Sequence, residues 1–271
     1  MRLHRAIAKG SHVSWSMNRI VVAALLAIAP LGVAAQQTPL DSLKRTPRPP
    51  AENVSWPTIG GAVAVVAFTT LFDPSVARAA AHHQGDDLAR LGNNLDRMGE
   101  VTVIVPVVLG TAAFGLVTKN REIIRLSVRT ATAIAIVSVT GQALKFATGR
   151  ARPYQDEDFD AVDFKPFSAW DTSFPSGHTM AAFALATTLG DAIGSPLIQG
   201  GLYALAGATG WARIAQQKHW ASDVAAGAAI GILAGKIAAG RVKFFGIRAP
   251  RVLVTPDAAV VSYGVPLPRI H

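Results

Sequence analysis

The chain has 271 residues, of which 50% are hydrophobic, 16% are charged and none is cysteine. This composition is more apolar than that of an average soluble domain, so it favours a membrane protein or an alanine-rich helical core. The formal net charge of +9 suits an acidic membrane surface or an anionic substrate. No stripe of lysine and arginine alternates with aromatic residues, so no nucleic-acid partner is expected. The lack of cysteine excludes disulfides and thiolate metal sites.

The N-terminal region has the pattern of a secretory signal peptide. Arg19 precedes a short apolar run that ends in the small residues Val33-Ala34-Ala35, which are typical of a cleavage site. We expect residues 1–35 to be a signal peptide, with an uncleaved N-terminal anchor as the alternative; the apolar run is short for a membrane span, which favours cleavage. Residues 36–55 are polar and rich in proline, so they predict a linker.

Six runs without a charged residue dominate the rest of the chain. Each is longer than a typical strand and none alternates strictly, so each predicts a helix. The runs are Asn53–Phe72, Val101–Thr118, Thr130–Leu144, Thr172–Gly190, Ala192–Ala212 and Val224–Gly235. The polar stretch between the first two predicts one or two short amphipathic helices. The expected fold class is all-α: a membrane-embedded bundle of about six core helices.

We expect this helical domain to cover residues 56–240 and a C-terminal tail to cover residues 241–271. In the tail, β-branched residues alternate on either side of Pro256-Asp257, which predicts a short β-hairpin.

The connection before the third predicted helix carries Lys119, Arg121, Arg125 and Arg129. By the positive-inside tendency it belongs in the cytoplasm, which places the other end of that helix in the periplasm. The same orientation starts the first helix in the cytoplasm, which conflicts with a cleaved export signal just upstream. Three solutions stay open: the first helix does not span, the signal is not cleaved, or the whole domain is exported.

The first motif is KFATGRARP, at the end of the third predicted helix. Lys145 and Arg152 are seven residues apart, so they can share one helix face. Pro153 disfavours helical geometry at Arg152 and turns its guanidinium off the helix end. Taken alone, this motif is more typical of a basic helix terminus that caps carbonyl groups.

The second motif is Pro175-Ser176-Gly177-His178, directly before an apolar run. A helix that begins just after Pro175 leaves the amides of Ser176, Gly177 and His178 unpaired, where the dipole favours an anion. Glycine lets a ligand approach the backbone, serine can cap or donate its hydroxyl, and histidine titrates near neutral pH. The alternative is an ordinary capped helix start.

The third motif lies within WARIAQQKHWASDVAAG. His219 and Asp223 are four residues apart, so on a helix they share one face. A carboxylate there can fix the imidazole tautomer and leave the other ring nitrogen as a nucleophile. Arg213 could reach the same place from the preceding helix end. The alternative is a simple ion pair on a solvated helix.

Together the motifs supply three cations, a set of backbone amides, two histidines and a carboxylate, an inventory that suits phosphoryl transfer. The order Lys145-x6-Arg152-Pro153, Pro175-Ser176-Gly177-His178 and Arg213-x5-His219-x3-Asp223 resembles the three-part signature of the type-2 phosphatidic acid phosphatase and vanadium haloperoxidase superfamily. One departure is Ala212, where the family usually has serine.

The resemblance implies a metal-independent phosphatase that needs no cofactor. In it, His219 would attack phosphorus to form a phosphohistidine, Asp223 would orient His219, and His178 would protonate the leaving group. The phosphate oxygens would be bound by Lys145, Arg152, Arg213, Ser176 and Gly177.

Apolar helices beside the site favour a phosphorylated lipid as substrate: phosphatidic acid, an isoprenyl diphosphate or an envelope glycolipid phosphate. We expect an inner-membrane protein whose active site faces the periplasm. The alternative is a soluble periplasmic acid phosphatase that acts on small phosphomonoesters.

Three other interpretations are weaker. A vanadium haloperoxidase could use the same oxyanion cradle, but the family's haloperoxidases are generally longer chains. A non-catalytic membrane scaffold or transporter should have lost at least one signature residue. The cluster His82-His83-x2-Asp86-Asp87 could bind a metal, but it lacks a defining spacing and is more typical of a solvated polar face.

Overall fold

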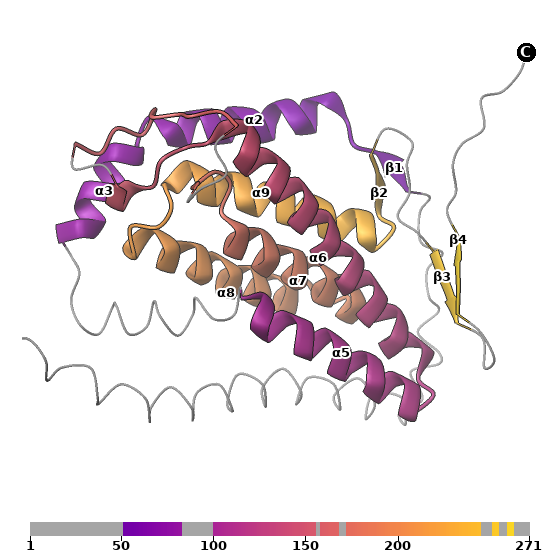
Figure 1. Ribbon diagram of the computed structural model, residues 1–271. Helices are drawn as coiled ribbons and strands as arrows, with labels where there is room; N and C mark the ends of the chain where they lie inside the picture. The colour runs from indigo at the N-terminus through magenta and orange to yellow at the C-terminus, as the bar shows by residue number, and fades with distance from the viewer. Residues whose placement is uncertain are drawn as a thin grey trace, which may run out of the picture.

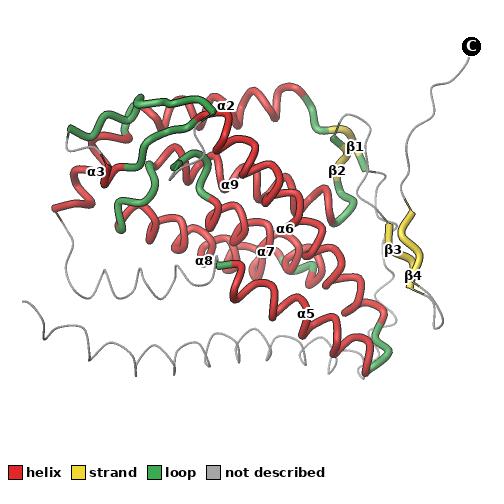
Figure 2. Tube along the Cα trace, viewed as in Figure 1, coloured by secondary structure: helices red, strands yellow, loops and turns green. Residues whose placement is uncertain are grey.

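The computed structural model describes residues 51–82, 100–155, 158–167 and 172–244, and two strands at 251–254 and 259–262. Within these ranges the chain is mainly helical (Figures 1 and 2). The α-helices are α2 (Trp56–Thr70), α3 (Asp73–His82), α5 (Val101–Val117), α6 (Arg121–Thr148), α7 (Gly177–Ile193), α8 (Pro196–Ala215) and α9 (Ala221–Ala238), and a short 3₁₀ helix, η3, covers Pro153–Gln155. The predicted signal peptide and most of the predicted linker lie outside the described residues.

All six predicted core helices are present, as α2, α5, α6, α7, α8 and α9, which confirms the all-α expectation. Helix α6 is much longer than its charge-free run because the side chain of Asn120 accepts hydrogen bonds from the first amides, well before Thr130. Helix α9 begins at Ala221, three residues before the predicted start. Helix α3 is one of the short helices expected in the polar stretch; residues 83–99, which hold most of the His-Asp cluster, are not described.

Helix α7 lies at the centre of the bundle and contacts α6, α8 and α9. Small side chains make these contacts close. Along α9 every fourth residue from Gly227 to Gly235 is a glycine, and a Cβ atom on Gly227 would lie 2.8 Å from the carbonyl oxygen of Ser176. The first turns of α7 and α9 are therefore held side by side. A buried apolar cluster continues this packing through Ala133, Val137, Met180, Ala184, Ala234 and Ala238.

The helices α6 to α9 alternate in direction, so the end of α6, the start of α7, the end of α8 and the start of α9 gather at one end of the bundle. All three sequence motifs lie at this end, which we call the motif end. At the opposite end Asp191 pairs with Arg241 and lies 3.8 Å from Arg129. The two-residue strands β1 (Glu52–Asn53) and β2 (Val242–Lys243) pair in parallel and bring the start of α2 to the end of α9. Figure 1 shows β1 and β2 on the right and α3 on the left.

The C-terminal strands β3 (Arg251–Val254) and β4 (Ala259–Ser262) pair antiparallel, which confirms the predicted hairpin. They flank Pro256-Asp257 as expected. The predicted domain limits at residues 56 and 240 stay predictions.

Apolar side chains cover much of the outside of the bundle. Helix α2 has no buried residue, although its exposed side chains include Val63, Phe68 and the neighbouring Leu71. Among the described residues, α6 and α9 are long and apolar enough to cross a membrane, and α2 and α3 together qualify as one span bent by 53°. A helix that is apolar on all sides and not covered by protein is typical of a lipid-facing element.

Candidate functional site

Two basic side chains of the first motif meet at one backbone oxygen. Lys145, in the last turn of α6, donates through Nζ to the carbonyl oxygen of Thr172 at 2.6 Å. Arg152 donates through Nη2 to the same oxygen at 3.4 Å and through Nη1 to the carbonyl oxygen of Lys218 at 3.4 Å. Lys145 and Arg152 therefore converge, but they do not share a helix face, because α6 ends at Thr148 and Arg152 lies beyond it, as the following Pro153 predicts.

The turn that separates these cations depends on Gly149. This residue ends α6 with φ of 57°, and a Cβ atom there would overlap the carbonyl oxygen of Lys165. A side chain would therefore be strained both by the left-handed backbone and by the loop that packs against it. Gly149 thus lets the chain reverse sharply between Lys145 and Arg152.

The third motif forms a loop between α8 and α9. The carbonyl oxygen of Arg213 accepts hydrogen bonds from the amides of Lys218 and His219 at 3.1 and 3.3 Å. Gln217 adopts φ of 57°, and its side-chain amide donates to the carbonyl oxygen of Ala77 in α3 at 2.9 Å. These contacts fix the loop and keep His219 at the buried end of α8. The Arg213 guanidinium, itself buried, donates to the Gln216 side chain at 3.2 Å.

His219 is paired with Asp223, but not in the way that the sequence predicts. The histidine lies in the loop, two residues before α9 begins, so the two residues do not share a helix face. Asp223 instead folds back over the helix start, where Oδ2 accepts the amide of Trp220 at 2.9 Å and lies 3.6 Å from His219 Nδ1. Such a return contact is favourable because the first amides of a helix lack internal partners.

The imidazole of His219 is buried, with 3% of the residue exposed. Burial lowers the pKa of His219 to about 4, against the opposing effect of the Asp223 carboxylate. The positive charges of Lys145 and Arg152 lower this pKa further, which places both cations within electrostatic reach of the ring. His219 is therefore neutral at physiological pH, the state in which a ring nitrogen can act as a nucleophile.

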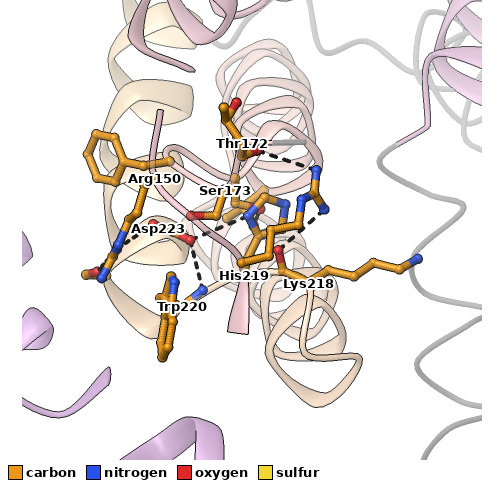
Figure 3. Close-up of polar contacts among 12 residues, drawn as sticks. Arg150, Thr172, Ser173, Lys218, His219, Trp220 and Asp223 are labelled. Atoms are coloured by element: carbon orange, nitrogen blue, oxygen red, sulfur yellow. Dashed lines mark hydrogen bonds and ion pairs between the residues drawn. The ribbon is translucent and has the colours of Figure 1, made fainter. Parts of the chain in front are cut away.

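A residue that the motif interpretation missed lies behind this pair. Arg150 is buried and makes salt bridges of 2.6 Å to Asp223 Oδ1 and 2.7 Å to Asp73 Oδ2, the first residue of α3. Asp73 also accepts the amide of Ser222 at 2.9 Å. Figure 3 shows Arg150 on one side of Asp223 and His219 on the other. The only indication of Arg150 in the sequence is that a second arginine lies two residues before Arg152. No spacing rule connects Arg150 with Asp73.

The second motif begins α7 as predicted, with Ser176 as the N-cap residue and Gly177 as the first helical residue. One expectation is wrong: the amide of Ser176 is not unpaired, since it donates to the carbonyl oxygen of Asp223 at 3.1 Å. The Ser176 hydroxyl is buried against Thr179 Oγ1 at 2.8 Å. A Cβ atom on Gly177 would meet no other atom within 4 Å, so the backbone is open at this residue. His178 follows in the first turn and is partly buried.

The site therefore combines a buried neutral imidazole, a carboxylate behind it, two converging cations and an open helix start. Helix N-termini and basic side chains are the common protein ligands of phosphate. No group of three or more His, Asp or Glu residues that could hold a metal ion occurs within the described ranges. Ala212 is buried in the last turns of α8, where its carbonyl oxygen accepts the amide of Gln216 at 3.0 Å.

Residues 126–245 match the family model of the PAP2 superfamily, so this segment of the chain is similar to that superfamily. The segment contains all the predicted site residues but not Asp73.

Two kinds of relatives accompany this match. Lipid A 1-phosphatase of Porphyromonas gingivalis is 34% identical over 145 residues, which are 52% of this chain and 30% of that protein, so only a minor part of the relative's length is matched. The crystal structure of the first transmembrane PAP2 type phosphatidylglycerolphosphate phosphatase from Bacillus subtilis shares the fold, with a TM-score of 0.53 at 17% identity over 66% of this chain and 93% of that chain. The crystal structure of Aquifex aeolicus LpxE is 25% identical with a TM-score of 0.48, over 62% of this chain and 94% of that chain.

Proposed function

We propose that this protein is a metal-independent phosphatase of membrane lipids that works through a phosphohistidine on His219. The observation that carries the proposal is that His219 is buried and neutral and lies close to two cations. The positive charges of Lys145 and Arg152 both lower the pKa of its ring. A nucleophile and oxyanion ligands in one place are the two requirements of phosphoryl transfer that a protein can meet without a metal.

In the proposed reaction, the Nδ1 atom of His219 faces Asp223, so Nε2 is the nitrogen that attacks phosphorus. The carboxylate stabilises the positive charge that develops on the ring as the new N–P bond forms. Lys145 and Arg152, together with Arg213, neutralise the phosphate oxygens. The open backbone at Gly177 accepts a further oxygen through its amide.

His178 has the second role, as the acid. It gives its proton to the ester oxygen as the P–O bond breaks, and then takes a proton from the water that attacks the phosphohistidine. The reaction releases the alcohol first and inorganic phosphate second, and it returns both histidines to their starting states. Ser176 contributes through its position at the helix start, where its buried hydroxyl and bonded amide hold Gly177 in place.

The exposed apolar surface supports a lipid substrate. Three aromatic residues at the motif end are exposed: Tyr154 in η3, and Phe164 and Phe167 in the loop that follows, at 54%, 44% and 72%. Apolar side chains beside a polar site are suited to an acyl chain attached to a phosphate head group. Because one relative is named Lipid A 1-phosphatase, a glycolipid phosphate of that type is the first substrate to test, followed by phosphatidic acid and isoprenyl diphosphates.

We also propose that the bundle spans the inner membrane with its motif end towards the periplasm. Arg121, Arg125 and Arg129 lie in the first turns of α6, at the opposite end, where Arg241 and Lys243 also lie. The positive-inside tendency assigns that end to the cytoplasm. The β1–β2 pairing starts α2 there as well, so this topology and a cleaved export signal exclude each other.

The orientation can be measured because the chain has no cysteine. Val162→Cys, in an exposed loop at the motif end, should react with a membrane-impermeant thiol reagent in intact cells. Thr118→Cys, at the other end, should react only after the membrane is opened. The reverse pattern contradicts the proposed orientation, and reaction of both in a soluble fraction supports the soluble alternative.

The activity is tested with purified protein and a panel of lipid phosphates, with p-nitrophenyl phosphate as a soluble comparison. We expect phosphate release from at least one lipid, persistence of this activity in a chelator, and inhibition by vanadate. His219→Gln should remove turnover, while the matched variant His82→Gln, at an exposed histidine, should keep it. Activity that depends strictly on a divalent metal, or a His219→Gln variant with the wild-type rate, contradicts the proposed mechanism.

A further inference from the structure

We propose that Asp73 and Arg150 are positioning residues that set the charge and orientation of Asp223 behind His219. Neither belongs to the three motifs, and Asp73 lies outside the segment that matches the PAP2 family model. The catalytic effect of these two residues rests on the proposed role of His219 as nucleophile. The contacts that join them to Asp223 do not depend on that role.

The first observation is that Arg150 has no donor left for a substrate. Its Nε donates to the carbonyl oxygen of Ala161 at 2.9 Å, and Nη1 donates to Ser222 Oγ at 2.8 Å and to Asp223 Oδ1 at 2.6 Å. Its Nη2 donates to Asp73 Oδ2 and to Ala161 O, both at 2.7 Å. These bonds use all five N–H groups of a guanidinium. Arg150 therefore cannot bind a phosphate oxygen and can act only through the groups that it holds.

The second observation is that two aromatic rings also lie against the guanidinium. Its central carbon lies 5.3 Å from the ring centroid of Trp220 and 5.5 Å from that of Phe164. Trp220 in turn donates its indole N–H to the carbonyl oxygen of Ala151 at 2.9 Å. A planar cation that contacts two aromatic rings and also forms five hydrogen bonds has little freedom to turn, so Arg150 holds the Asp223 carboxylate in one position.

The third observation is the charge balance. The salt bridges join two buried carboxylates to one guanidinium, so the three groups carry (−1) + (+1) + (−1) = −1. If Arg150 were paired with Asp223 alone, it would cancel the charge that faces His219. Because Asp73 shares Arg150, Asp223 keeps a net negative charge towards the ring, and this charge favours the imidazolium character that develops during attack on phosphorus.

Other charged or titratable groups also lie around His219, and the test variants must leave them unchanged. Asp223 faces the ring from α9, Lys145 from the end of α6, and Arg152 from the segment after it. On the remaining neighbouring helices, Arg213 lies in the last turn of α8 and His178 in the first turn of α7. None of these residues is altered in the variants below, so a change in the titration of His219 reports on Asp73 and Arg150.

The test is an NMR titration of protein labelled with ¹⁵N-histidine, in which the signal of His219 is assigned by its loss in His219→Gln. Asp73→Asn removes a negative charge and should lower the pKa of His219. Arg150→Gln removes a positive charge and should raise it. Each shift should be on the order of 0.5 unit or more. In the active protein, the acid limb of the kcat/KM profile should move in the same directions, with kcat reduced about 10- to 100-fold.

Matched controls come from the ion pair at the opposite end of the bundle. Asp191→Asn and Arg241→Gln make the same changes in a carboxylate–arginine pair far from His219, and they should leave its titration unchanged. If a single variant at the site does not fold, the double variant Asp73→Asn/Arg150→Gln keeps the net charge of −1 and should return the pKa of His219 towards the wild-type value while kcat stays low.

Opposite shifts in the two single variants support the proposal, and so does recovery in the double variant. Shifts of the same sign, or no shift in any of the three, overturn it and leave Asp73 and Arg150 a structural role only. The NMR titration does not depend on turnover. If the wild-type protein releases no phosphate but its His219 titration shifts as expected, the proposed function fails while the charge relationship stands.

Discussion

Lys145 and Arg152 donate hydrogen bonds to the same carbonyl oxygen, that of Thr172, from opposite sides of the turn at Gly149. The two cations are therefore held near each other by a shared backbone acceptor. A phosphate oxygen can take the place of this carbonyl oxygen as their acceptor. Two basic side chains at one place are suited to bind an anion.

The first prediction concerns the geometry of Arg152. Arg152→Ala should lower kcat/KM on the order of 100-fold, because one oxyanion ligand is lost. Arg152→Lys should recover only part of this loss, since an ammonium group keeps the charge but not the planar fork that spans Thr172 and Lys218. Steady-state kinetics on the best lipid substrate measure both. Lys165→Ala, in a side chain that is 73% exposed and pairs with Asp163, is the surface control and should match the wild type; equal effects of the three changes would contradict a specific role of Arg152.

The second prediction concerns the open backbone at Gly177. Because a Cβ atom there meets nothing within 4 Å, Gly177→Ala should fold normally and be no less stable than the wild type. The added methyl group would, however, occupy the space in which we place a phosphate oxygen, so KM should rise and kcat should fall. Gly200→Ala, in α8, also meets nothing within 4 Å and is the control. A Gly177→Ala variant with unchanged kinetics would show that the phosphate does not approach this residue.

The third prediction concerns pH. The pKa of His219 is about 4 in the folded protein and 6.5 for an unperturbed histidine. Between these values the unfolded chain binds a proton at this histidine that the folded chain does not bind. The free energy of unfolding therefore rises with pH across this window, and the contribution of His219 to stability is lost as the pH falls from 6.5 towards 4. The effect should be roughly 3 kcal/mol. Denaturation of His219→Gln should show a flatter dependence over the same window, whereas a slope equal to that of the wild type would mean that His219 is not the responsible group.

The same shift sets the acid limit of activity. A neutral His219 is available for attack down to pH about 4, so kcat/KM on the acid side should stay constant until the pH approaches that value. A limb near 6.5 instead would indicate that His219 titrates as an exposed histidine.

Much of the fold was predictable because its signals are local. The charge-free runs mark six helices, and the alternation around Pro256-Asp257 marks the hairpin; both are properties of short windows. Helix ends were less accurate: α6 begins at Arg121 because Asn120 caps it, and charged residues in its first turns hide this start from a search for apolar runs. The order of the three motifs likewise indicated one shared site, because their spacing places each at a helix end.

The contacts behind the site were not predictable in the same way. Asp73 and Arg150 are 77 residues apart in sequence, and nothing in the windows around them indicates that they meet. The amide of Ser176 is a second example. Because it lies at a helix start it was expected to be unpaired, but the close packing of α7 on α9 supplies the carbonyl oxygen of Asp223 as its acceptor. Local rules identify groups that need a partner, and tertiary packing decides which partner they obtain.

The proposed mechanism requires that phosphate is transferred to His219. The most direct measurement is to mix the protein with a substrate labelled with ³²P in its phosphate group, to quench the reaction under alkaline conditions that preserve phosphohistidine, and to identify the labelled peptide by mass spectrometry. We predict label on His219, no label in His219→Gln, and unchanged labelling in His82→Gln. Label on any other residue, or turnover without a labelled enzyme in rapid-quench experiments, would contradict a phosphohistidine at His219.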